Sequence, residues 1–393
     1  MPGISGTFDR TLGEAQSLGG PAARLADARL ARLRDLVKRN RATLDLDDAG
    51  QPVVRSEVLA LEPSADSLAV ARQAGFVVDH EVKLPALGVA FVVLRASGAQ
   101  STVQAVHRLR RLDPAGRYDF DHLYGASGPA GTPLASRSRA CSAALVGVRL
   151  GMVDGAVAVG HPAFARSAIE QRSFVASPGA AVNHGTAVAS LMVGDAPGFA
   201  GSAPGARLYA ADVYGAGPAG GSAEAVVRAL DWMASNRVPV INVSLVGPAN
   251  LMLEAAVRAL GAKGELLVAP VGNDGPAAPP QYPASYPGVI AVTAVDAKGR
   301  LLPEAGRARH VDFAARGAGV TVAKPGGGYD KARGTSFAAP VVAGKLVQWL
   351  REPDPARSAQ AIADLAARAR KAGSALGHGV VGEPSPKTSN APC

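Results

Sequence analysis

From residue 146 onward, the chain alternates between short apolar runs and longer segments in which small or apolar residues recur at helical spacing. Short runs of β-branched and leucine residues are typical of strands buried on both faces of a parallel sheet. We expect such strands at 146–153, 207–213, 240–243, 266–269 and 289–295. We expect helices at 183–192, 222–236, 251–260, 336–347 and 354–372. Strands that alternate with helices predict an α/β fold, a mostly parallel sheet with helices on both faces.

Residues 54–124 follow a different pattern and are predicted to form a separate unit. Short strands are expected at 58–61, 76–78, 88–94 and 118–120, and helices at 64–74 and 101–112. The second helix opens with Ser101 and Gln104 at the spacing of a capping box. The order strand, helix, strand, strand, helix, strand predicts a small α+β domain of the ferredoxin-like kind.

Three further segments complete the predicted organisation. Residues 1–53 carry leucines at helical spacing and are expected to form an N-terminal helical extension. Residues 125–140, rich in Gly, Pro, Ser and Ala, are predicted to link the small unit to the main domain at 141–372. Residues 373–393 lack periodicity and are expected to form a flexible tail.

Composition and charge bear on partners and compartment. The net charge of +9 is spread along 393 residues, and its densest run, Arg108–Arg111, has no nucleic-acid-binding module around it. We therefore expect no nucleic-acid partner. No run approaches 18 apolar residues, so no membrane span is expected. Residues Met1–Gly6 show no basic region followed by an apolar stretch, so no signal peptide is visible and the localisation stays open.

The chain has two cysteines, Cys141 and Cys393. Cys141 stands shortly before the first expected strand of the main domain, and Cys393 is the last residue. A disulfide that pins the tail and two unrelated thiols are both compatible with these positions. Two distant cysteines alone cannot build a metal site.

Four polar residues stand directly beside predicted buried elements. Asp154 ends one strand, Asn273 follows another, and His184 opens a small-residue helix. Ser336 stands at the start of a helix, where backbone N–H groups and the helix dipole suit a group whose reaction partner becomes an oxyanion. Singly, these residues have ordinary interpretations as helix caps, a turn asparagine and a structural histidine. Together, the chain order Asp, His, Ser indicates nucleophilic catalysis by a serine.

Five motifs carry a resemblance to a known family. They are Val153–Gly155, His184–Ala189, Asn242–Leu245, Val271–Asn273 and Gly334–Pro340. With these motifs in this order over roughly residues 140–350, the chain resembles the subtilisin-like (subtilase) serine endopeptidases. The resemblance implies a subtilisin-like fold and the hydrolysis of peptide bonds in protein or peptide substrates.

The resemblance also implies catalytic roles for four residues. Ser336 would be the nucleophile, His184 its general base, and Asp154 the group that orients the imidazole. Asn273 would donate its side-chain amide to the oxyanion, together with the backbone N–H of Ser336.

Substrate binding is expected along one strand edge and one glycine. An added strand recognises the main chain of the substrate and leaves pockets to select its side chains. The resemblance assigns the strand edge to Ser244, Leu245, Val246 and Gly247, and the lining of the first pocket to Gly272. An ordinary buried strand end is the alternative for the first four residues.

A ferredoxin-like unit directly before a subtilase domain resembles the inhibitory propeptide of this family. The resemblance implies that residues 54–124 inhibit the chain's own main domain, with Asp121–Tyr124 continuing the last strand into the substrate cleft. The linker at 125–140 would then contain the processing site. An unrelated accessory domain is the alternative for this unit.

One departure from the family pattern concerns calcium. Many subtilases have His-Pro-Asp where this chain has His161–Pro162–Ala163, and Ala163 offers no side-chain oxygen. We therefore expect no metal site in this region, and we expect no cofactor.

The sequence leaves two classes of function. The first is a serine endopeptidase made as a self-inhibited zymogen, and the alternative is a catalytically silent subtilase-fold protein that binds peptides. An α/β-hydrolase esterase is disfavoured, because Ser336 lacks a Gly-x-Ser-x-Gly elbow.

Overall fold

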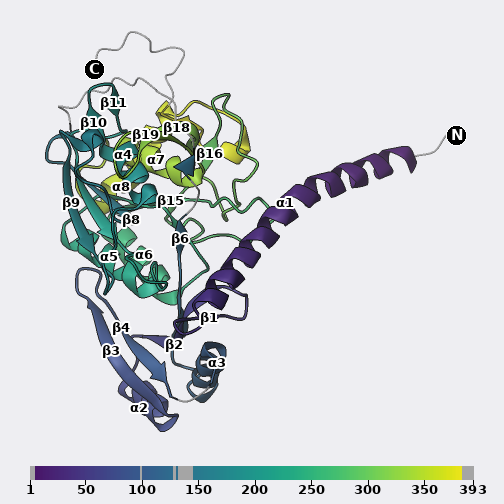
Figure 1. Cartoon of the computed structure of the whole chain (residues 1–393), viewed down its shortest axis with the longest axis vertical. Helices are drawn as coiled ribbons and strands as arrows, with labels where there is room; N and C mark the ends of the chain where they lie inside the picture. The colour runs from purple at the N-terminus through teal and green to yellow at the C-terminus, as the bar shows by residue number, and fades with distance from the viewer. Residues whose placement is uncertain (1–4, 98–99, 127–129, 132–144, 383–393) are drawn as a thin grey trace.

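Figure 1 shows the computed structural model, which describes residues 5–97, 100–126, 130–131 and 145–382. A long N-terminal helix, α1 (Ser5–Arg39), leads into a small unit of strands and helices, and a larger α/β unit follows. The N-terminal half of α1 projects away from both units in this view. Cys141 and Cys393 lie outside the described residues, so their pairing stays an open prediction.

One sheet of eight strands forms the centre of the large unit. Its strand order is β20-β17-β16-β15-β13-β8-β12-β9, and every neighbouring pair is parallel. The strands are β8 (Arg149–Asp154), β9 (Ala168–Ser173), β12 (Arg207–Asp212), β13 (Val240–Val243), β15 (Leu266–Pro270), β16 (Ile290–Val295), β17 (Phe313–Arg316) and β20 (Val380–Val381). Because all strands run the same way, their carboxyl ends meet at one edge, where the following loops can bring side chains together.

Helices cover both faces of this sheet, as the sequence predicts. On one face lie α4 (Asn183–Val193), α7 (Ala339–Leu346) and α8 (Pro355–Arg368), and on the other lie α5 (Ala223–Ser235) and α6 (Leu251–Ala262). Alternate strand residues point to opposite faces, so Met152 belongs to the first core and its neighbour Val153 to the second. Both residues are fully buried.

The small unit consists of one sheet that is covered by other elements on both faces. Its sheet has the order β1-β2-β4-β3, with β5 also paired to β2. The elements are β1 (Leu44–Leu46), β2 (Pro52–Leu61), α2 (Ala65–Gln73), β3 (Phe76–Leu84), β4 (Val89–Ala96), α3 (Thr102–Leu112) and β5 (Tyr118–His122). Helices α2 and α3 cover one face, and the capping box of Ser101 and Gln104 is present at the start of α3. On the other face, Leu59 and Phe91 share a core cluster with α5 and α6, so this face packs on the large unit.

The remaining strands lie outside the two main sheets. They are β6 (Gly125–Ala126), β7 (Ala130–Gly131), β10 (Asp195–Ala196), β11 (Phe199–Ala200), β14 (Leu245–Val246), β18 (Ala318–Ala323) and β19 (Tyr329–Arg333). The 3₁₀ turns are η2 (Pro162–Phe164), η3 (Thr335–Phe337) and η4 (Ser374–Leu376). Among the described residues, no helix has the length and the apolar character that crossing a membrane requires.

The structure differs from the sequence prediction at Ser336 and in the tail. Ser336 lies in the 3₁₀ turn η3, and the α-helix begins only at Ala339. Gly334, at φ +140°, adopts a backbone conformation that side chains disfavour, and this sets the turn apart from the preceding strand β19. The sequence predicts a flexible tail from residue 373 onward, but Val380 and Val381 are buried and form β20 at the edge of the large sheet.

Candidate active site

Three polar side chains meet at the carboxyl edge of the large sheet. Asp154 ends β8, His184 is the second residue of α4, and Ser336 lies in η3. His184 Nδ1 lies 3.0 and 2.9 Å from the two carboxylate oxygens of Asp154, and His184 Nε2 lies 2.9 Å from Ser336 Oγ. The sequence predicts all three residues, and the structure brings them into one hydrogen-bonded line.

A close backbone approach between Gly185 and Gly155 allows this alignment. A side-chain carbon at Gly185 would lie 2.1 Å from the carbonyl oxygen of Gly155, so only glycine lets the start of α4 approach the end of β8 this closely. The ring of Phe337 lies beside the imidazole, with 5.3 Å between the ring centroids. Helix α4 and turn η3 therefore fix His184 from two sides.

Burial and hydrogen bonding define the tautomer of His184. Asp154 is fully buried, and its Oδ1 also accepts a 2.7 Å hydrogen bond from the backbone N–H of Gly155. An ionised carboxylate only accepts hydrogen bonds, so His184 Nδ1 donates to Asp154. The neutral imidazole then presents Nε2 as the acceptor for the Ser336 hydroxyl. This arrangement can remove a proton from a serine that attacks an electrophile.

Asn273 follows β15 and is tied to the turn that carries Ser336. The backbone N–H of Thr335 donates to Asn273 Oδ1 at 2.9 Å, and Thr335 Oγ1 donates to the Gly272 carbonyl at 3.2 Å. With its oxygen used as an acceptor, the Asn273 amide has its nitrogen as the donating group. These bonds hold a side-chain donor close to Ser336.

The predicted strand edge also reaches the serine. Ser244 Oγ donates to the backbone carbonyl of Ser336 at 3.2 Å, and Asn242 Nδ2 donates to Ser244 Oγ at 2.8 Å. Leu245 and Val246 form β14, which pairs antiparallel with β6 of the N-terminal segment. Extended chain therefore already lies along the edge that the sequence assigns to a substrate.

Gly247 of the predicted strand edge and Gly272 of the predicted first pocket both lie in crowded places. A side-chain carbon at Gly247 would lie 2.6 Å from the ring of Tyr124. Gly272 has φ +93°, and a side-chain carbon there would lie 3.2 Å from the side chain of Gln281. Glycine at these two positions leaves room for neighbouring side chains beside the strand edge.

Tyr124 is a site residue whose side chain the sequence gives no role. Its ring is fully buried beside Gly247, and its hydroxyl donates to the Pro248 carbonyl at 2.8 Å. Its backbone N–H donates to the Gly221 carbonyl at 2.8 Å, so the main chain is held between two edges of the large unit. Burial raises the pKa of the Tyr124 phenol well above its ordinary value. The sequence predicts Tyr124 at the end of a strand, but Gly247 and Pro248, which its side chain contacts, lie 123 and 124 positions later.

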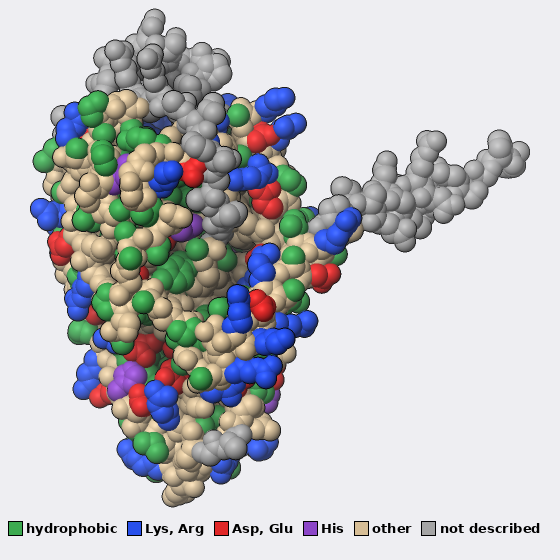
Figure 2. Space-filling view, viewed as in Figure 1, with side chains coloured by type: hydrophobic (Ala, Val, Ile, Leu, Met, Phe, Trp, Pro, Cys, Tyr) green, Lys and Arg blue, Asp and Glu red, His purple; other side chains and the backbone are tan. Residues whose placement is uncertain are grey.

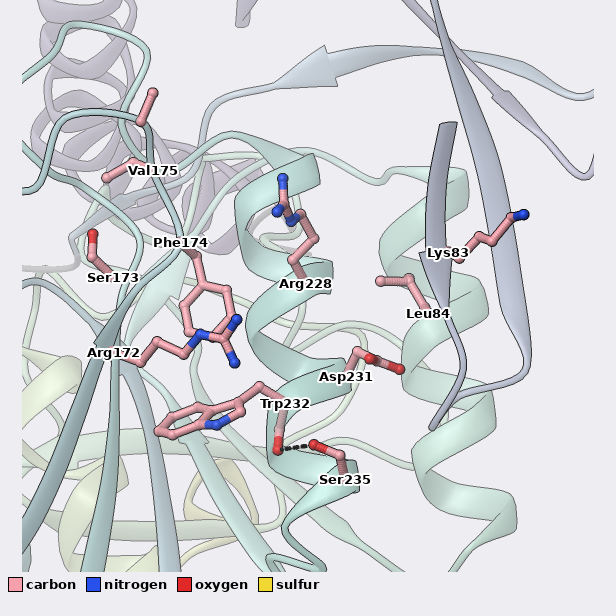
Figure 3. Close-up of a pocket in the computed structure, with 11 residues that line it drawn as sticks. Lys83, Leu84, Arg172, Ser173, Phe174, Val175, Arg228, Asp231, Trp232 and Ser235 are labelled. Atoms are coloured by element: carbon pink, nitrogen blue, oxygen red, sulfur yellow. Dashed lines mark hydrogen bonds between the residues drawn. The ribbon is translucent and has the colours of Figure 1, made fainter. Parts of the chain in front are cut away.

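A cavity beside the N-terminal unit is lined by none of the candidate active-site residues described above. It has a volume of about 420 Å³ and opens between β3, α5 and the end of β9 (Figure 3). Figure 3 shows the Arg172 guanidinium over the Phe174 ring, and its carbon lies 5.1 Å from the ring centroid. Trp232 packs on Phe174 with 5.6 Å between ring centroids. The cavity is therefore lined by aromatic and charged side chains, and Asp154, His184 and Ser336 are not among its lining residues.

The region where the sequence departs from the family's calcium pattern contains an ion pair. Ala163 is buried in η2, and the carboxylate of Asp195 in β10 is almost fully buried. Arg166 donates its Nε–H to Asp195 Oδ1 at 3.0 Å. Across the described residues, no three His, Cys, Asp or Glu side chains cluster so as to hold a metal ion.

The fold and the site define a class of protein, an α/β protein with an Asp–His–Ser line at the carboxyl edge of a parallel sheet. The family model described as the subtilase family matches residues 147–379, and the chain belongs to this family. Subtilisin Savinase of Lederbergia lenta is 37% identical over 164 residues, which cover 41% of this chain and 60% of that protein. Subtilisin E of Bacillus subtilis (strain 168) is 30% identical over 270 residues, with 65% of this chain and 70% of that protein covered. The chain thus spans less than two thirds of the length of the first relative.

A solved structure extends the comparison of fold to the N-terminal unit. Fervidolysin from Fervidobacterium pennivorans, described as a keratinolytic enzyme related to subtilisin, matches with a TM-score of 0.69 and 20% identity. The match covers 86% of this chain and 61% of that one. Residues from 145 onward make up less than two thirds of the 393 residues. A match over 86% of the chain must therefore include part of the N-terminal region as well.

Proposed function

We propose that this chain is a serine endopeptidase that uses Ser336 as nucleophile. The observation that carries the proposal is the line of hydrogen bonds from Asp154 through His184 to Ser336 Oγ. Membership of the subtilase family supports the same reaction. A catalytically silent peptide-binding protein would not need a base within 2.9 Å of a buried serine hydroxyl.

The geometry supports the following sequence of proton and electron movements. Ser336 Oγ attacks the carbonyl carbon of a peptide bond while His184 Nε2 takes its proton. Asp154 keeps Nδ1 protonated and stabilises the imidazolium that forms. The Asn273 amide and the backbone N–H of Ser336 donate to the oxyanion. His184 then passes the proton to the leaving amine, and water releases the acyl group by the reverse path.

The N-terminal region fits the role of an inhibitor built into the chain. Its sheet packs on α5 and α6, and its last strand continues through Leu123, bridged to Ser222, into the β6–β14 pair. The side chain of Tyr124 fills a pocket beside Gly247. We infer that residues up to Ala126 occupy the edge where a substrate would bind, which keeps the full-length chain inactive.

The register of the β6–β14 pair supports a proposal for the cleavage site. Gly125 pairs with Val246 and Ala126 with Leu245, so the chain runs toward Ser244. Ser244 in turn is hydrogen-bonded to the carbonyl of Ser336. We therefore propose that cleavage occurs in the linker that follows Ala126 and ends near Arg139.

Labelling and processing of the full-length protein test this function. Wild-type protein is incubated until any self-cleavage stops, then treated with a fluorophosphonate probe and with casein, and Ser336→Ala is treated in parallel. We expect labelling, casein hydrolysis and loss of about 13 kDa in the wild type alone. This mass corresponds to removal of the residues before the cut, since the whole chain of 393 residues has a mass of 39.7 kDa. A new N-terminus between 127 and 139 supports self-processing. Labelling that persists in Ser336→Ala, or a wild type that binds peptides but never cleaves them, overturns the proposal.

A further inference from the structure

A buried arginine connects the N-terminal helix to the large unit. Arg29 of α1 is only 8% exposed, although most of its neighbours on the helix are open to solvent. Its Nε lies 3.0 Å from Asp274 Oδ2, and its Nη2 donates to Gln281 Oε1 at 3.1 Å. Arg32, one turn later, donates to Asp274 Oδ1 at 3.0 Å from an exposed position. One carboxylate therefore accepts bonds from two arginines of the same helix.

The two acceptors lie on the loop that forms the candidate active site. Asp274 directly follows Asn273, and the Gln281 side chain lies against Gly272. Both residues are buried. Arg29 thus contacts the loop between β15 and β16 next to the predicted oxyanion donor and the predicted pocket wall.

Apolar packing contributes little to this contact. A cavity of about 360 Å³ lies between Ala26 and Leu30 of α1 and the loop residues Pro280 and Tyr282. Among the α1 side chains that the structure describes, the one that is both apolar and buried is Val37, which packs near the C-terminal end of the helix on Leu44 and Val54 of the small unit. Among the side chains that the structure describes, those of Arg29 and Arg32 make the polar contacts between α1 and the large unit. Loss of one partner from a buried charge pair is strongly destabilising.

We propose that Asp274 and Gln281 form a docking site for an arginine-presenting helix, and that its occupant is the chain's own α1. The helix binds a surface separate from the β14 edge that β6 covers. After a cut in the linker, α1 keeps the released N-terminal region on the large unit as a second point of attachment. Two linked contacts separate far more slowly than one, because the second rebinds at high effective concentration. The consequence for inhibition rests on the proposed protease function.

Amide hydrogen exchange tests the docking without any catalysis. In the full-length Ser336→Ala background, Arg29→Gln is compared with Arg34→Gln, a matched change at an exposed arginine of α1 for which the described structure contains no ion pair. We expect amides of residues 23–33 to exchange at least tenfold faster in Arg29→Gln and to be unchanged in Arg34→Gln. Asp274→Asn, changed on the other side of the contact, gives the same increase. Equal exchange in the Arg29 and Arg34 variants overturns the proposal.

Retention of the cleaved N-terminal region tests the consequence. Proteins with Ser336 intact are allowed to self-cleave and are then diluted. We expect the Arg29→Gln fragment to dissociate at least tenfold faster, with peptide hydrolysis appearing correspondingly sooner, while Arg34→Gln follows the wild type. Fragments that dissociate at the same rate contradict the second attachment. If no variant hydrolyses peptides although exchange rises in Arg29→Gln, the protease function fails and the docking site stands.

Discussion

Asn273 accepts a hydrogen bond from the backbone N–H of Thr335 through its side-chain oxygen, and in the proposed reaction its amide nitrogen donates to the developing oxyanion. Such a bond is strongest in the transition state, so it lowers the barrier more than it tightens substrate binding. In subtilisin, a relative of this chain, loss of one such donor lowers kcat by roughly 10²–10³. We expect Asn273→Ala in the processed protein to lower kcat by a similar factor with KM little changed. Steady-state kinetics on a peptide substrate measure this, and a change confined to KM would contradict the role.

Tyr124 offers a second prediction for a single residue. Tyr124→Phe keeps the buried ring but leaves the Pro248 carbonyl without this donor, which typically costs about 1–3 kcal/mol. Tyr124→Ala also removes the ring from its pocket beside Gly247 and is expected to cost about 3–5 kcal/mol. Urea unfolding of both variants in the uncleaved Ser336→Ala background measures the order. A Phe variant as unstable as the Ala variant would mean that the ring contributes nothing to this contact.

Residues of the candidate site could be predicted because each stands at an end of an element that the sequence shows clearly. Asp154 closes an apolar strand, and His184 opens a small-residue helix. Arg29 carries no such signal, because it is one of many arginines on a helix and its partner Asp274 lies 245 positions later. Arg29 is buried because α1 packs on a distant loop of the large unit, and the hydrophobic pattern of the helix itself does not encode this packing.

Three of the strands that the sequence does not predict, β9, β17 and β20, lack the long apolar run of a central strand. Strand β9 has the sequence Ala-Ile-Glu-Gln-Arg-Ser and lies at the edge of the sheet with polar side chains exposed, so it lacks the apolar run of a central strand. Strand β20 has only two residues, Val380 and Val381, and β17 consists largely of alanine. Tertiary contacts, rather than local pattern, make these segments strands. The central strands and helices were predictable because burial on both faces dictates their composition.

The contact between η2 and the β10–β11 hairpin leads to an element-scale prediction. The Asp195 carboxylate is almost fully buried while Arg166 is largely exposed, so screening by solvent limits the strength of their ion pair. We expect Arg166→Ala to lower the free energy of unfolding by about 1–2 kcal/mol, because a buried carboxylate loses its cationic partner. We also expect a chelator to leave the melting temperature of the wild type unchanged. Calorimetry of Arg166→Ala and of the wild type, with and without chelator, checks both, and a large chelator-induced drop that calcium restores would show that the chain binds calcium.

At the scale of the whole molecule, charged groups gather where the small unit meets the large one. His80 of β3 lies 2.8 Å from Asp79 Oδ2 and 3.1 Å from Glu224 Oε2 at the start of α5. Asp121 is fully buried and accepts a 3.1 Å hydrogen bond from the backbone N–H of Glu224. Figure 2 shows red and purple side chains close together in the lower part of the molecule, below the large unit. Arg95 and Arg228 complete the charged surroundings through ion pairs with Asp79 and Glu224.

Two groups of this cluster, His80 and Asp121, have raised pKa values, whereas hydrogen bonds from Arg95 and His80 lower the pKa of Asp79 within the small unit. Burial alone would lower the pKa of His80, but bonds to the carboxylates of Asp79 and Glu224 raise it above its ordinary value overall. Burial, with repulsion from Glu57 and Glu224, raises the pKa of Asp121 well above its ordinary value. The docked state therefore holds protons that the separated units would release. Its stability falls as pH rises through these raised pKa values.

This linkage predicts that alkaline conditions loosen the N-terminal unit. The contribution of the His80–Glu224 contact is present while His80 is protonated, and it is lost as pH rises through the raised pKa that His80 has in the docked state. We expect the self-cleaved N-terminal fragment to dissociate faster at pH 8–9 than at pH 6, and His80→Gln to flatten this profile. His107→Gln is the matched control, because His107 pairs with Asp48 inside the small unit. Dissociation followed by size-exclusion chromatography across this pH range measures the slope, and a fragment held more tightly at pH 9 than at pH 6 would contradict the linkage.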